Sequence, residues 1–124
     1  MPKREQAIQK EIMLTLSQAG CLVWRNNTGV AWQGEQVGKT RETITLRNYR
    51  PVHFGLCKGS ADLVGVTPCG RFLACEVKTP TGRASDAQER FLLAVNRAGG
   101  LGFIARSADE ALAALKQFTE AQGE

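Results

Sequence analysis

A predicted β-hairpin near the middle of the chain carries charged residues in places where a purely structural hairpin does not need them. Residues 63–66 and 72–77 are short apolar runs, and the turn between them contains a proline and a glycine. Asp62 opens the first run, and Glu76 and Lys78 close the second. Residues two apart on a strand share a face, and the turn brings the outer ends together. We therefore expect Asp62, Glu76 and Lys78 to meet at one end of the hairpin.

This cluster of charges has two interpretations. Neighbouring carboxylates repel and are costly to bury unless positive charge lies between them, and a hard divalent cation takes oxygen ligands of this kind. In that interpretation Asp62 and Glu76 bind a metal ion, while Lys78 acts on a phosphate or on a water molecule. The alternative is a surface aspartate beside a cross-strand Glu–Lys pair, which is common and contributes little to stability.

The length and composition bound the kind of protein. A chain of 124 residues with 43% apolar residues is typical of one globular domain with its own core. The chain has no run of about 18 apolar residues, and its start lacks the apolar segment of a signal peptide. We therefore expect a cytoplasmic protein without a membrane partner. The four cysteines form no CxxC pair, which argues against a zinc site with His53.

Positive charge is concentrated before the hairpin. Residues 1–58 contain nine lysines and arginines against four glutamates, whereas residues 59–124 contain seven against eight acidic residues. The basic residues are densest at 39–50, where aromatic residues lie between them, a pattern typical of nucleic-acid contact. The alternatives are a solvated basic surface and aromatic side chains that pack in a core.

Hydrophobic periodicity and capping signals predict the order of elements. The expected elements are a helix at 3–19, a strand at 21–25, a basic segment with a strand candidate at 43–47, the hairpin at 63–66 and 72–77, a helix at 86–98, a strand at 101–105 and a helix at 107–119. This order predicts a mixed sheet flanked by helices. Gln88 lies three residues after a serine N-cap and suits a capping box. Glu5 either joins the carboxylates or favours the dipole of the first helix.

Several of these motifs together resemble the VRR-NUC family of the PD-(D/E)XK nuclease superfamily. Asp62 follows a GxxD pattern at 59–62, and Glu76-Val77-Lys78 matches the ExK element. A TGRxSxxQ segment follows at 81–88, and Gly99-Gly100 precedes the next expected strand. The resemblance covers essentially the whole chain, so the chain looks like a stand-alone domain of the phage or bacterial type. It implies a restriction-endonuclease-like α/β core in the order α-β-β-β-α-β-α, as one domain over 1–124 with a basic hairpin or loop insert at about 30–55.

The resemblance also implies an activity and a set of site residues. Members are divalent-metal-dependent nucleases, so the implied cofactor is Mg²⁺ or Mn²⁺. The implied catalytic residues are Glu5, Asp62, Glu76, Lys78 and Gln88. The implied metal ligands are Asp62, Glu76, the Val77 carbonyl and, directly or through water, Glu5. Lys78 is expected to orient the attacking water or stabilise negative charge, and Gln88 to fix Lys78 or the nucleophile.

The expected substrate is branched DNA, because small members of this kind are similar to Holliday-junction resolvases, which act as homodimers. The candidate nucleic-acid-binding residues are Arg25, Asn26, Lys39, Arg41, Arg47, Arg50, Lys58 and Arg83. Two features depart from the pattern: Ala61 replaces the proline that often precedes the aspartate, and the insert matches no known motif. The alternatives are a non-catalytic nucleic-acid-binding module and a flap-type or sequence-specific nuclease.

Overall fold

The computed structural model describes residues 3–123 and divides into two compact units. One contains the chain up to Asn26 and from Lys58 onward, and the other is Asn27–Cys57. The elements in order are α1 (Lys3–Gln18), β1 (Leu22–Arg25), β2 (Gly29–Lys39), β3 (Ile44–Phe54), β4 (Leu63–Val66), β5 (Phe72–Val77), α2 (Asp86–Arg97), β6 (Leu101–Ala105) and α3 (Ala108–Ala121). The division into a single nuclease domain with an insert stays a prediction.

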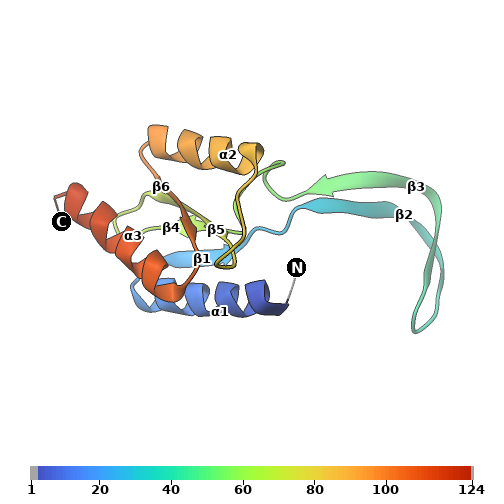
Figure 1. Cartoon of the computed structure of the whole chain (residues 1–124). Coiled ribbons are helices and arrows are strands. Elements are labelled where there is room, and N and C mark those ends of the chain that lie inside the picture. The colour runs from blue at the N-terminus through green and yellow to red at the C-terminus, as the bar shows by residue number, and fades with distance from the viewer. Residues whose placement is uncertain (1–2, 124) are drawn as a thin grey trace. The chain divides into compact units, whose positions relative to one another are not determined.

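The first unit is a mixed four-stranded sheet flanked by three helices. The strand order is β1-β4-β5-β6, in which β1, β4 and β5 pair antiparallel and β6 pairs parallel to β5. Helix α2 covers one face of this sheet, and α1 and α3 cover the other (Figure 1). The predicted α/β class is confirmed, and the core follows the α-β-β-β-α-β-α order, with β2 and β3 inserted after β1.

Alternation along β5 divides the core into two layers. Leu73, Cys75 and Val77 are fully buried in the cluster that includes residues of α1 and α3. Ala74 instead packs with Leu92 and Val95 of α2. Because side chains on a strand alternate between faces, Glu76 points to the same side as Ala74, toward α2. The strand pattern therefore directs a carboxylate into the layer between the sheet and α2.

Helix ends lie close to the positions that the sequence predicts. Gly20 has a φ of 97°, the left-handed conformation that glycine adopts readily after the end of a helix. Ser85 caps α2 in a complete capping box, and Ser107 caps α3 by accepting a hydrogen bond from the Glu110 amide. Within residues 3–123, no helix has the length and apolar character required to cross a membrane.

The second unit is a long antiparallel hairpin of β2 and β3, each 11 residues long. The sequence analysis expected a basic hairpin or loop insert at about 30–55 with one strand candidate at 43–47, and the structure has two strands there, at 29–39 and 44–54. The strands pair from Gly29 opposite Phe54 to Lys39 opposite Ile44, with two register shifts. One shift lies beside Asn48, whose φ is 53°. Nearly every residue of the hairpin is exposed, because no other layer of the unit covers it.

The two faces of this hairpin differ in character. Cross-strand partners share a face. One face, called the apolar hairpin face below, carries most of the large apolar side chains together with some polar partners, such as Lys39 opposite Ile44: its apolar members are Val30, Trp32, Ile44, Leu46 and Tyr49. The rings of Trp32 and Tyr49 meet edge to face, with centroids 5.5 Å apart. The opposite face carries Arg47 and Arg50, and the Arg50 guanidinium donates to Gln33 Oε1.

Candidate active site

The candidate site lies where β4 begins and β5 ends. Leu63 pairs with Cys75, so the antiparallel register continues to Asp62 opposite Glu76. The segment before Asp62 is held by Asn26. The Asn26 side-chain amide donates to Ser60 Oγ at 2.8 Å and to the Ala61 carbonyl at 2.9 Å. The Asn26 backbone N–H donates to the Asp62 carbonyl at 2.8 Å, which continues the pairing of β1 with β4.

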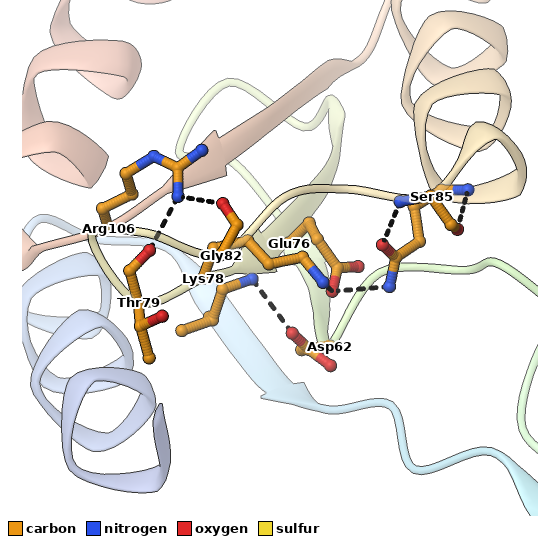
Figure 2. Close-up of polar contacts among 9 residues, drawn as sticks. Asp62, Glu76, Lys78, Thr79, Gly82, Ser85 and Arg106 are labelled. Carbon is orange, nitrogen blue, oxygen red and sulfur yellow. Dashed lines mark hydrogen bonds and ion pairs between the residues drawn. The ribbon is translucent and has the colours of Figure 1, made fainter. Parts of the chain in front are cut away.

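Asp62 is oriented across the end of the neighbouring strand. Its Oδ2 accepts a hydrogen bond from the Val77 backbone N–H at 3.0 Å, as Figure 2 shows. The side chain is half-buried, so part of the carboxylate stays accessible to water or to a ligand. Because Val77 follows Glu76 in the same strand, this hydrogen bond fixes the position of Asp62 relative to Glu76.

Glu76 is the most deeply buried ionisable group of the site. Its side chain is about 1% exposed. Its Oε1 accepts a hydrogen bond from Gln88 Nε2 at 3.1 Å and lies 3.7 Å from Lys78 Nζ (Figure 2). Its Oε2 is buried and has no hydrogen-bond partner among the residues that the structure describes. Buried polar atoms are normally paired, so this oxygen is available to a ligand that the polypeptide does not supply.

Gln88 completes the capping box that the sequence predicted, and its side-chain amide contacts Glu76, while its expected action on Lys78 or the nucleophile stays a prediction. Its Oε1 accepts from the Ser85 backbone N–H at 2.8 Å, while its own backbone N–H donates to Ser85 Oγ at 3.2 Å. With Oε1 held by the cap, the amide NH₂ is directed at Glu76. The capping box thus stabilises the start of α2 and, through the same side chain, orients a donor in the site.

The pKa of the Glu76 carboxyl is raised from 4.5 to about 8, and burial is the largest cause. The neighbouring Asp62 side chain is the next cause, and the charge of Glu5 contributes a smaller amount to the increase. The Lys78 ammonium opposes it, because a nearby positive charge favours the ionised carboxylate. The polypeptide alone therefore supplies too little positive charge to hold Glu76 ionised at neutral pH.

These residues fit a hard divalent cation. Asp62 and Glu76 supply two carboxylates with an unpaired buried oxygen, and Mg²⁺ sites commonly use one or two carboxylates together with substrate phosphates and water. Within residues 3–123, no three histidine, cysteine, aspartate or glutamate side chains form a group that could hold a metal ion. Glu5 lies in the first turn of α1, and its charge contributes to the raised pKa of Glu76. Its expected place in the metal shell, directly or through water, stays a prediction.

The predicted nucleic-acid-binding residues divide between the two units. Arg25 ends β1, and Lys58 and Arg83 lie in exposed connections of the first unit. The exposed residues Lys39, Arg41, Arg47 and Arg50 all belong to the hairpin unit. Asn26 is half-buried, and its side-chain amide is engaged by the segment before Asp62. Contacts of these eight residues with nucleic acid stay predictions.

One residue of the site region was not anticipated from the sequence. Arg106 Nη1 donates to the Thr79 carbonyl at 2.7 Å and to the Gly82 carbonyl at 2.6 Å (Figure 2). Both acceptors belong to the loop between Lys78 and α2. Backbone carbonyls carry no side-chain signature, so the sequence gives no sign of these contacts. The one available signal was the position of Arg106 directly after the strand at 101–105, beside the strand that carries Glu76.

Comparison with protein families agrees with this geometry. The VRR-NUC domain matches residues 3–109, which include every residue of the site described above. Comparison with curated proteins gives no match. The family resemblance that the GxxD, ExK and TGRxSxxQ motifs indicated is confirmed.

Proposed function

Because the chain belongs to the VRR-NUC family of PD-(D/E)XK-type nuclease domains, we propose that it is a divalent-metal-dependent DNA endonuclease that cuts branched DNA such as four-way junctions. The observation that carries the proposal is the buried, unpaired Oε2 of Glu76 beside Asp62. A hairpin that served only the fold gains nothing from two adjacent carboxylates, one of them buried without a full set of partners. A site that binds a cation and a phosphodiester explains both.

In this proposal Asp62, Glu76 and the Val77 carbonyl hold Mg²⁺ or Mn²⁺. When bound, such an ion polarises a phosphate oxygen and lowers the pKa of a bound water. Asp62 is pre-oriented for this task by the Val77 N–H, and Glu76 Oε1 by the Gln88 amide. Removing a hydrogen bond of this kind to a metal-binding carboxylate commonly lowers metal affinity or activity by about 10- to 100-fold.

Lys78 supplies the positive charge that the reaction itself needs. Attack of water on a phosphodiester builds negative charge on the phosphate oxygens, and a fixed cation stabilises that charge. The Lys78 ammonium lies 3.7 Å from Glu76 Oε1. At this distance it stays near the carboxylates and can still contact a phosphate. Its side chain is 16% exposed, which leaves it reachable by a phosphate. Glu5 contributes negative potential that favours cation binding.

The experiment that tests the function is cleavage of a labelled panel of DNA structures. The panel contains a four-way junction, a flap, plain duplex and single strand, each with Mg²⁺, Mn²⁺ or EDTA. Metal-dependent cutting centred on the junction is the expected result. Cutting of the flap alone keeps the chemistry but contradicts the proposed substrate. Tight, salt-sensitive binding without cutting under any metal contradicts the enzyme and favours a binding module that uses the hairpin arginines.

We also propose that the protein is a homodimer joined through the apolar hairpin face. Val30, Trp32, Ile44 and Tyr49 are each at least 50% exposed, although an isolated two-stranded hairpin is marginally stable in water. A second copy of the same face covers these side chains symmetrically. The opposite face, with Arg47 and Arg50, then stays free for phosphates. Two copies also provide two sites, which cleavage of both strands of a junction requires.

The dimer is tested by a pair of adjacent substitutions on opposite faces of β2. Trp32→Glu places a charge in the apolar face, opposite Pro51, and is expected to weaken dimerisation by at least about tenfold, since a charge is costly to bury without a partner. Ala31→Glu, opposite Val52, places the same charge on the other face and is expected to leave the dimer intact. Sedimentation equilibrium measures both. A monomeric wild type, or equal effects of the two variants, contradicts the proposed interface.

A substitution at Gln88 separates its two roles. Gln88→Glu keeps the acceptor for the Ser85 N–H, and a negative charge in the first turn suits the helix dipole, so the stability of α2 is expected to persist. The same change replaces the donor to Glu76 with a second carboxylate. DNA cleavage is therefore expected to fall by roughly 10- to 100-fold. Thermal melting and cleavage rates measure the two effects, and unchanged cleavage contradicts a role for Gln88 in the site.

A further inference from the structure

We propose that Arg106 is a positioning residue of the nuclease site, which acts by clamping the loop between Lys78 and Gln88. The inference rests on the proposed function, because it concerns how the same site is held in place. Arg106 directly follows β6, and β6 runs parallel to β5 with Ala105 opposite Val77. The Lys78 backbone N–H donates to the Ala105 carbonyl at 3.1 Å. Lys78 and Arg106 therefore leave the sheet side by side at the same edge.

The Arg106 guanidinium closes a turn that begins directly after Lys78. Its Nη1 donates to the carbonyls of Thr79 and Gly82, at 2.7 and 2.6 Å. The Gly82 N–H in turn donates to the Thr79 carbonyl at 3.1 Å, so one NH₂ group holds both ends of the turn. A side chain at Gly82 would lie 3.2 Å from Thr79 Oγ1 and 3.6 Å from Lys78 Cβ, which shows that the turn folds back against the lysine.

Arg106 is itself held from the other side. Its backbone N–H donates to Glu110 Oε1 at 3.2 Å, in the first turn of α3. The arginine is half-buried, and its bonds to carbonyls are charge-assisted and short. Arg106 thus links the start of α3 to the loop after β5: Glu110 holds its backbone, and its side chain holds the loop.

Both ends of the clamped loop converge on one oxygen. Before the turn, Lys78 Nζ lies 3.7 Å from Glu76 Oε1, and after it the Ser85 cap directs Gln88 Nε2 to the same oxygen. Figure 2 shows Arg106, the turn and these contacts in one view. A loop free to move between these anchors changes the position of the lysine and of the glutamine relative to Glu76. Small displacements of this kind lower turnover more than substrate binding.

The test combines protease sensitivity with kinetics in Arg106→Gln. Arg83 lies exposed within the loop and is a trypsin site, and Arg90, exposed on α2, serves as an internal reference. The ratio of cleavage after Arg83 to cleavage after Arg90 is expected to rise at least about tenfold, because local opening controls proteolysis. Mass spectrometry measures this ratio. On the preferred DNA of the panel, kcat is expected to fall about tenfold with KM within about twofold.

Two further variants control the interpretation. Arg97→Gln removes an exposed arginine from the last turn of α2 and is expected to leave both readouts unchanged. Arg106→Lys keeps the positive charge but not the planar fork, and it is expected to behave like Arg106→Gln. If Arg106→Gln does not fold, the same measurements are made on Arg106→Lys. If Arg106→Lys has the wild-type cleavage ratio and kcat, the clamp is overturned, because a positive charge alone then suffices at this position.

The remaining outcomes separate the clamp from the proposed function. An unchanged cleavage ratio overturns the clamp, and an increased ratio with unchanged kcat overturns the positioning role. A wild type that cuts none of the DNA substrates overturns the proposed function only. In that case the protease ratio and the rise in Tm caused by Mn²⁺ still decide the proposal, and Arg106→Gln is expected to reduce that rise.

Discussion

Asp62→Asn is expected to lower the rate of metal-dependent DNA cleavage by roughly 10³-fold or more, which corresponds to about 4 kcal/mol of transition-state stabilisation. In the wild type the Val77 N–H donates to Asp62 Oδ2 at 3.0 Å, and the side-chain oxygen of asparagine can accept the same hydrogen bond. The fold and the register of β4 and β5 are therefore expected to persist. What the substitution removes is the negative charge that a divalent cation needs from this ligand. Single-turnover cleavage with saturating protein measures the effect on the chemical step.

Asp109→Asn is the matched control for this prediction. It removes an exposed aspartate from the first turn of α3 and is expected to leave cleavage within about twofold of the wild type, at a small cost to helix stability. Circular dichroism and DNA binding in EDTA are expected to be the same for all three proteins. Cleavage by Asp62→Asn at the wild-type rate contradicts the assignment of the metal site to the end of the β4–β5 hairpin.

The part of the site that could be predicted from the sequence is the part set by local rules. Two apolar runs and a Pro-Gly turn determine the β4–β5 pairing, and pairing register alone places Asp62 opposite Glu76. Ser85 and Gln88 are spaced for a capping box regardless of the rest of the fold. The contact of Gln88 with Glu76 follows only after α2 is packed on the correct face of the sheet. The family resemblance placed Gln88 in the site but implied Lys78 or the nucleophile as its partner.

The features that the sequence predicted only in part or not at all depend on contacts without a local pattern. The insert at about 30–55 was expected as a hairpin or a loop, and the first of its two strands was not located. These strands have no core behind them, and glycines interrupt the first, so alternation of apolar residues gives a weak signal. Arg106 binds backbone carbonyls, which every residue type carries. The expected place of Glu5 in the metal shell, directly or through water, stays a prediction, because helical periodicity alone does not determine how close the first turn of α1 lies to the carboxylates.

Glu76→Gln is expected to abolish DNA cleavage and, in the metal-free protein, to increase stability at alkaline pH. The pKa of Glu76 is about 8 in the folded protein, against 4.5 for the unperturbed group. Between these values the folded state keeps a proton that the unfolded state releases. The free energy of unfolding of the wild type therefore falls as pH rises through this range, by up to about 1.4 kcal/mol per pH unit. Glutamine does not titrate, so the variant lacks this loss.

Urea unfolding at pH 5, 7 and 9 in EDTA measures this prediction. At pH 5, below most of the titration, the two proteins are expected to have similar stability. At pH 9 the variant is expected to be the more stable one. Glu11→Gln, which removes an exposed carboxylate from the same protein, controls for the loss of one negative charge and is expected to follow the wild type. Equal pH dependence of Glu76→Gln and wild type contradicts a buried, protonated Glu76.

A divalent cation is expected to reverse the order of stability. Because a bound cation favours ionised Glu76, millimolar Mg²⁺ or Mn²⁺ is expected to raise the Tm of the wild type at pH 8 and to have little effect on Glu76→Gln. The same carboxylate then destabilises the empty site and stabilises the occupied one. A purely structural role of Glu76 does not explain this opposition, whereas a catalytic role does, since the charge of Glu76 is costly to bury until a cation is bound.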